Sequence, residues 1–118
     1  MKHAHSASID KERINLIEFE PYRLVELVHM WRTSFEAGVG ITDPHPIADQ
    51  QQYFVDEVLP RNEVRVVLLD DRLVGFVAAT KESVAQLYVR VGFHRRGIGT
   101  RLLSWAKDQS AGSLWLYT

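Results

Sequence analysis

Residues 94–99, His-Arg-Arg-Gly-Ile-Gly, constrain this chain more than any other stretch. They follow residues 84–89, a mostly apolar run with the length of a buried strand. Beyond them, apolar side chains recur at the spacing of one helix face: Ile98, Leu102, Trp105 and Ala106. The sequence therefore predicts a strand that passes through a short basic loop directly into an amphipathic helix.

The first turn of such a helix is suited to binding an anion. Its backbone N–H groups have no partner within the helix, and the helix dipole adds partial positive charge there. Gly97 and Gly99 leave these groups uncovered, and Arg95 and Arg96 add full positive charge beside them. The loop therefore predicts a phosphate site, and a pyrophosphate suits it because two linked anions can share adjacent donors. The alternative is a plain strand–loop–helix connection whose glycines serve tight packing.

Two other phosphate-binding loops do not fit this spacing. A dinucleotide fingerprint needs a third small residue where Leu102 stands. A P-loop needs a lysine after its last glycine, whereas Gly99 is followed by Thr100 and Arg101.

The rest of the chain alternates between strand and helix patterns. Strands are expected at residues 14–19, 64–69, 73–78, 84–89 and 114–117, with a tight turn at Asp70-Asp71. Helices are expected from Pro21 to the glycines at 38 and 40, from Ile47 to Leu59, and from Gly97 to a C-cap at Gly112. In the second helix we expect four residues to be buried: Phe54, Val55, Val58 and Leu59. This order predicts an α+β fold, a layered, mostly antiparallel mixed sheet with helices on both faces.

Composition narrows the class of protein. The 118 residues suit a single domain, which we place at residues 13–118 after a disordered polar tail at 1–12. His3 and His5 lie in that tail, so we expect no metal site there. A formal net charge of −1 favours neither nucleic acid nor a membrane surface as a partner, and the absence of cysteine excludes disulfides and Cys-ligated zinc. No apolar run approaches the ~20 residues of a membrane helix, so we expect a cytoplasmic protein.

Residues 86–89 and 94–103 together resemble motif A of the GCN5-related N-acetyltransferase (GNAT) family, whose pattern is Arg/Gln-x-x-Gly-x-Gly/Ala. The expected element order from Ile14 to Tyr117 is also similar to that of the family. His94 stands where arginine or glutamine is usual, which leaves open whether a side-chain contact has been lost. The resemblance implies an acyl-CoA N-acyltransferase fold and an enzyme that moves the acetyl group of acetyl-CoA to a primary amine by direct attack.

The resemblance also implies where acetyl-CoA, the co-substrate, would lie. Its pyrophosphate would bind the N–H groups of residues 95–100, and its pantetheine arm would pair like an added strand with the backbone of residues 87–89. The implied cofactor-binding residues are Leu87, Tyr88, Val89, His94, Arg95, Arg96, Gly97, Ile98, Gly99 and Thr100. The thioester would lie where the fourth and fifth strands splay apart. The protein would mainly position the reactants, remove the amine proton and polarise the carbonyl.

Glu82 is the predicted catalytic base, because it lies at the start of the fourth strand, near where many relatives keep a carboxylate. A turn residue that faces water is the alternative for this position. His45, in the loop with two prolines at residues 41–46, could line the acceptor pocket. Trp31 and Phe35 could form its walls, although their helical spacing also fits core packing.

Relatives in this family normally continue past the fifth strand with another helix and two more strands. The sequence ends inside the fifth strand, so we expect either an incomplete fold whose exposed strand edge recruits a second copy, or a protein that continues past Thr118. The expected partners are a small-molecule or protein amine. Two alternatives to an enzyme are a coenzyme-A-binding module without turnover and a domain that holds some other phosphate.

Overall fold

A five-stranded sheet forms the centre of the computed structural model, which describes residues 14–110, 112 and 115–116. The strands lie in chain order: β1 (Ile14–Glu18), β2 (Glu63–Leu69), β3 (Arg72–Ala79), β4 (Ser83–Val89) and β5 (Trp115–Leu116). The first four are antiparallel to their neighbours, whereas β5 runs parallel to β4. The tail predicted at residues 1–12 and the outer ends of the predicted fifth strand lie outside the described residues.

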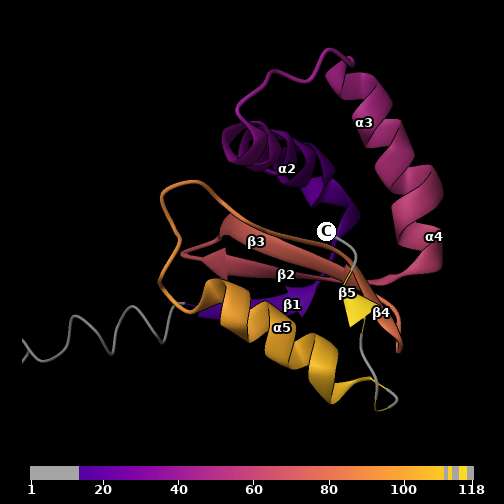
Figure 1. The fold of residues 1–118 in the computed structure, drawn as a ribbon, viewed down its shortest axis with the longest axis vertical. Coiled ribbons are helices and arrows are strands. Elements are labelled where there is room, and N and C mark those ends of the chain that lie inside the picture. The colour runs from indigo at the N-terminus through magenta and orange to yellow at the C-terminus, as the bar shows by residue number, and fades with distance from the viewer. Residues whose placement is uncertain (1–13, 111, 113–114, 117–118) are drawn as a thin grey trace, which may run out of the picture.

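Helices cover both faces of the sheet, as the sequence predicted (Figure 1). On one face lie a short 3₁₀ turn, η1 (Pro21–Arg23), the long helix α2 (Leu24–Val39), and a second helical stretch. That stretch comprises α3 (Ile47–Tyr53), the π-helical segment η2 (Phe54–Val58) and α4 (Leu59–Arg61). The opposite face is covered by α5 (Ile98–Asp108). None of the helices in the described part of the chain is long and apolar enough to span a bilayer.

An aromatic cluster holds α2 and η2 on their face of the sheet. Trp31, Phe54 and Phe76 meet edge to face, with ring centroids 5.9–6.1 Å apart. The rings of Phe76 and Tyr88 stack at 6.0 Å, which extends the cluster to β4. Aromatic pairs at these separations add to the stabilisation that burial alone provides.

The other face is packed more closely, because Gly75 of β3 lets α5 approach the sheet. A Cβ atom at Gly75 would lie 2.9 Å from Ile98 Cγ2 and 3.2 Å from Leu102 Cδ1. Ile98, Leu102 and Ala106 are buried here as the helical spacing predicted. Trp105 is only half-buried, and the guanidinium of Arg65 lies over its ring at 4.8 Å.

The predicted elements match the structure to within a residue or two at most ends. The tight turn is confirmed, because Asp70 and Asp71 both have left-handed φ angles, 52° and 68°. The predicted burial of Val55 is wrong: its side chain is 41 % exposed, because Phe54 and Val58 occupy the helix face that packs on the sheet.

The predicted C-cap at Gly112 is also wrong. The helix α5 ends at Asp108, and its C-cap is Gln109. Polar side chains end it early: Gln109 Nε2 donates to the carbonyl of Thr80 at 2.9 Å, and Ser110 Oγ donates to the carbonyl of Lys107 at 2.8 Å. Ser110 Oγ and the backbone N–H groups of Gln109 and Ser110 satisfy carbonyl groups at the end of the helix, so no left-handed glycine is needed.

Candidate functional site

The first turn of α5 presents free backbone donors. The first helical hydrogen bond runs from Arg101 N to Gly97 O at 2.9 Å, so the N–H groups of residues 98–100 precede it. Gly97, the N-cap, has a left-handed φ of 80°, and no described side chain caps this end of the helix. These donors lie at the positive end of the helix dipole, beside the exposed residues of the preceding loop, although Ile98 itself is buried.

Internal packing does not require the second glycine of this turn. A Cβ atom at Gly99 would meet only Val89 Cγ2, at 3.6 Å, an ordinary contact. At Gly97 a Cβ atom would meet nothing within 4 Å. The close approach of α5 to the sheet depends instead on Gly75, so tight packing does not explain why residue 99 lacks a side chain.

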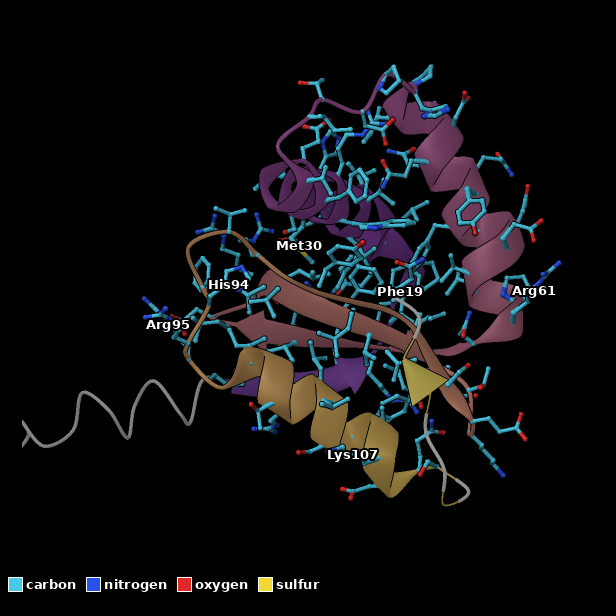
Figure 2. The ribbon with its side chains drawn as sticks, in the orientation of Figure 1. Phe19, Met30, Arg61, His94, Arg95 and Lys107 are labelled. Carbon is cyan, nitrogen blue, oxygen red and sulfur yellow. The ribbon has the colours of Figure 1, made fainter. Side chains whose placement is uncertain are left out.

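Three arginines gather at the loop before α5. Arg96 and Arg72 place their guanidinium groups over the ring of Phe93, at 5.1 and 5.3 Å from its centroid. Arg95 has a left-handed φ of 67° and is exposed beside His94 (Figure 2). Local sequence gave no indication of Arg72, which β3 supplies from outside the motif.

Arg90 holds the start of this loop in place. Its Nε donates to Leu73 O at 2.8 Å, and its Nη2 lies 3.5 Å from Glu26 Oε2. The same Glu26 oxygen accepts a hydrogen bond from Leu73 N at 2.9 Å. Burial, and then the positive charge of Arg72, lower the pKa of Arg90, while Glu26 acts against this shift. The end of β4 is thereby tied to both β3 and α2.

The predicted cofactor strand has an open edge. Within the described residues, β5 pairs with β4 only at Ser83 and Val84. Arg90 N donates to Val74 O at 2.7 Å, and the alternation of an antiparallel pair then turns the N–H and C=O groups of Leu87 and Val89 away from β3.

A cavity of about 420 Å³ lies against this edge. It is lined by Ser34, Ala37, Gly38, Leu87, Tyr88, Val89, Val91 and His94. The structure thus brings together four predicted residues of β4 and its loop with three small residues of α2 that sequence reasoning missed. Ser34 also donates from Oγ to Val89 O at 3.0 Å. The spacing of these small residues, i, i+3 and i+4, was the available signal, because it places them on one helix face.

A second cavity, of about 480 Å³, lies between α2, α3, the loop at 41–46 and β4. Four aromatic side chains line it: Trp31, Phe35, Tyr53 and Tyr88. Its polar lining consists of Arg32, Asp43, His45, Asp49, Gln50 and Gln86. His45, Trp31 and Phe35 were considered from sequence for such a pocket, and they do lie on one. Tyr88 lines both cavities, so the two hollows border the same residue of β4.

Hydrogen bonds fix the loop at 41–46 on α2. Asp43 Oδ1 accepts from His45 N at 2.9 Å and lies 2.8 Å from His45 Nδ1. These hydrogen bonds, from the backbone first and the ring second, together with Arg32, hold the pKa of Asp43 below its usual range. Arg32 also donates to the carbonyl of His45 and to Gln50 Oε1, the latter at 2.9 Å. Asp43 N donates to Glu36 Oε2 at 2.7 Å.

Glu82 lies apart from both cavities. It is exposed in the turn before β4, where its backbone N donates to Thr80 Oγ1 at 3.1 Å. At the rise of a strand, about 3.3 Å per residue, Glu82 is about 13 Å from Gln86 along the chain. Its role as a base stays a prediction. Among the described residues, no cluster of three or more His, Asp or Glu side chains is arranged to hold a metal ion.

The layered sheet carries an uncapped helix turn and an open strand edge beside two cavities. Comparison with known families gives the particular class: the acetyltransferase (GNAT) family matches residues 24–118. Since this match covers most of the sequence, the chain belongs to the GNAT acetyltransferase family, and the predicted family and α+β fold class are confirmed.

Solved structures of acetyltransferases share the fold at low identity. A possible acetyltransferase from Clostridium difficile 630 has a TM-score of 0.67 and 16 % identity, over 89 % of this chain and 79 % of that one. PaiA N-acetyltransferase from Thermoplasma acidophilum, in complex with coenzyme A, has a TM-score of 0.61 and 17 % identity, over 80 % and 70 %. An aminoglycoside acetyltransferase from an uncultured soil metagenomic sample, in complex with sisomicin, has 0.61 and 16 %, over 92 % and 79 %. No curated protein matches the sequence.

Proposed function

We propose that this protein is an N-acetyltransferase that moves the acetyl group of acetyl-CoA to a primary amine by direct attack. Acetyl-CoA is the acetyl donor of the GNAT family. The observation that carries the proposal is the uncapped first turn of α5 beside the open edge of β4, in a chain of this family. The two features present backbone donors to a pyrophosphate and an unpaired strand edge to an amide-containing arm.

The residues present fit acetyl-CoA. The N–H groups of residues 95–100 would hold its pyrophosphate, with the charges of Arg95 and Arg96 beside it. The outward N–H groups of Leu87 and Val89 and the C=O group of Leu87 would hold its pantetheine arm along the smaller cavity, while Val89 O accepts from Ser34 Oγ. When bound, the co-substrate supplies an activated acetyl thioester.

The larger cavity would hold the amine. Tyr88 borders both cavities, which supports a site in which the amine and the thioester lie next to this residue and react without a covalent enzyme intermediate. The outward N–H groups of β4 would polarise the carbonyl oxygen, since donors fixed by the sheet need no reorganisation during the reaction.

The amine must lose a proton, and the chain offers two candidate acceptors. Glu82 is the residue predicted from the sequence, but it lines neither cavity. His45 lines the amine cavity, and its Nδ1 is engaged by Asp43 Oδ1 at 2.8 Å, which leaves Nε2 for a proton. The position of His45 favours it as the acceptor, directly or through one water.

Two measurements separate this function from its alternatives. Calorimetric titration should show that acetyl-CoA binds and that inorganic pyrophosphate alone binds more weakly. Equal binding of both would favour a general phosphate-binding domain. Release of free thiol in the presence of a panel of amines should then show turnover. Tight binding of acetyl-CoA with no thiol release for any amine would favour a coenzyme-A-binding module.

A further inference from the structure

We propose that the acceptor is a small amine with a single positive charge and an aromatic or other flat apolar body. The inference rests on the proposed function, because it concerns the cavity that would hold the amine. It commits to a chemical class that excludes anionic acceptors, polycations and the flexible side chain of a protein lysine.

The aromatic walls are the first support. The Trp31 ring is tilted against two others. Its centroid lies 6.5 Å from that of Tyr53, at an interplanar angle of 43°. It lies 6.3 Å from that of Tyr88, at an angle of 46°. The three tilted rings border one cavity, to which Phe35 also contributes. Rings at these separations and angles present faces and edges that bind another flat group more strongly than a flexible alkyl chain.

Core packing does not account for all of these rings. Trp31 and Tyr88 contact the buried aromatic cluster, but Tyr53 and Phe35 belong to neither hydrophobic core. The Tyr53 side chain is 51 % exposed, and its one aromatic contact among the described residues is Trp31. A large apolar ring that borders a cavity without supporting the core is available to contact a ligand.

The charges of the cavity are the second support. Its lining contains one guanidinium, Arg32, and two carboxylates, Asp43 and Asp49, which leaves one negative charge when His45 is neutral. Arg32 is engaged by Asp43 at 3.7 Å and by Gln50 at 2.9 Å, so it is not free for an anionic ligand. Asp49 makes no side-chain hydrogen bond or ion pair within the described part of the chain. One uncompensated carboxylate suits one ammonium group.

The size of the cavity sets the third condition. About 480 Å³ lies within the range of small-molecule sites, roughly 300–1,000 Å³. This volume accommodates a one- or two-ring amine. A polycation such as sisomicin, which the soil acetyltransferase binds, would bring several ammonium groups to a lining with one spare carboxylate.

The test compares five amines, of which 2-phenylethylamine and n-hexylamine are similar in length and differ in shape. Binding of 2-phenylethylamine, n-hexylamine, spermidine, sisomicin and a lysine peptide is measured by calorimetry with coenzyme A present, which cannot transfer an acetyl group. We expect 2-phenylethylamine to bind about tenfold more tightly than n-hexylamine, as expected for stacking on one or two rings. Equal or tighter binding of hexylamine, of a polycation or of the peptide would overturn the proposal.

A matched pair of variants assigns the preference to the cavity. Tyr53→Ala should reduce the advantage of phenylethylamine over hexylamine about fivefold, whereas Tyr53→Phe should retain it. Because Tyr53 is half exposed, both variants should keep the melting temperature of the parent. An unchanged preference in Tyr53→Ala would contradict the assignment.

The same samples distinguish this inference from the proposed function. Loss of amine selectivity with normal binding of acetyl-CoA would overturn only the acceptor class. Absence of acetyl-CoA binding, or absence of acetyl transfer to every amine that binds, would overturn the proposed function while the ranking of amine affinities stands.

Discussion

The two cavities that share Tyr88 in their lining are built in different ways. The side proposed to hold acetyl-CoA, called the donor side, consists largely of one continuous stretch: β4, its loop and the first turn of α5. It presents mainly backbone groups. The acceptor side draws its lining from α2, the loop at 41–46, α3 and β4, and it presents mainly side chains. A site made of backbone needs glycines at fixed positions and leaves a local motif. A site made of side chains from distant segments leaves none.

The same contrast predicts how each side responds to substitution. On the donor side, what matters is whether a side chain covers the backbone donors. On the acceptor side, what matters is which side chain is present. Substitutions on each side should therefore affect one ligand and spare the other.

The largest effect on ligand binding is expected at Gly99. A valine there would cover N–H groups of the first helical turn, so Gly99→Val should weaken binding of acetyl-CoA by about 100-fold or more, the equivalent of two charge-assisted hydrogen bonds. Gly99→Ala, whose Cβ meets an ordinary contact at 3.6 Å, is the matched control for folding and should show a smaller loss. Calorimetry measures both. Wild-type affinity in the valine variant would place the pyrophosphate elsewhere.

Removal of the proton acceptor should come next. If His45 takes the proton, His45→Gln should lower kcat by about 10²- to 10⁴-fold while acetyl-CoA affinity is retained, and Glu82→Gln should change little. The pH–rate profile gives a second readout, since loss of the proton acceptor should remove the acidic limb of the parent profile. A large loss confined to Glu82→Gln would return the role to the residue predicted from sequence.

The arginines should contribute mainly through charge. Arg95→Ala or Arg96→Ala should weaken acetyl-CoA binding by about 1–3 kcal/mol, and the loss should shrink at high salt. Arg61→Ala is the control, because Arg61 is an equally exposed arginine on α4, far from the loop (Figure 2). A loss that does not depend on salt and accompanies a lower melting temperature would indicate a structural role.

The smallest effect is expected in the loop at residues 41–46, where the hydrogen bonds to Asp43 depend on pH. Because the folded pKa of Asp43 is depressed by hydrogen bonds from His45, their stabilisation is complete above the ordinary pKa of aspartate and is lost as the pH falls through the depressed value. Amide signals of Ile41, Thr42, Asp43 and His45 should therefore shift in acid, whereas signals of the loop at residues 94–100 should not follow that titration. Coincident titration of both loops would mean that the two sides are not independent.

The sequence predicted the fold where local chemistry decides it. Alternation and β-branched residues fixed the strands to within a residue or two, and Asp70-Asp71 marked the tight turn. It failed where tertiary packing or a side chain from elsewhere decides. Val55 is exposed because two neighbours on its helix already meet the sheet, and α5 ends at Asp108 because Gln109 bonds to the distant Thr80.

The candidate site divides in the same way. The donor loop could be predicted because its residues are consecutive and its binding groups belong to the backbone. Arg72 and Tyr53 could not, because nothing local in the sequence places a residue of β3 beside that loop or a residue of α3 in the cavity that Tyr88 lines.

An amide-resolved NMR titration is the most direct test of whether the first turn of α5 holds the pyrophosphate, because it shows which backbone groups respond to coenzyme A. We expect coenzyme A to shift the amide signals of residues 87–89 and 95–100. We expect 2-phenylethylamine to shift the Trp31 indole signal and to leave residues 95–100 unchanged. Saturation with coenzyme A that leaves the amides of residues 98–100 unperturbed would contradict the account, because the uncapped turn of α5 would then not hold the pyrophosphate.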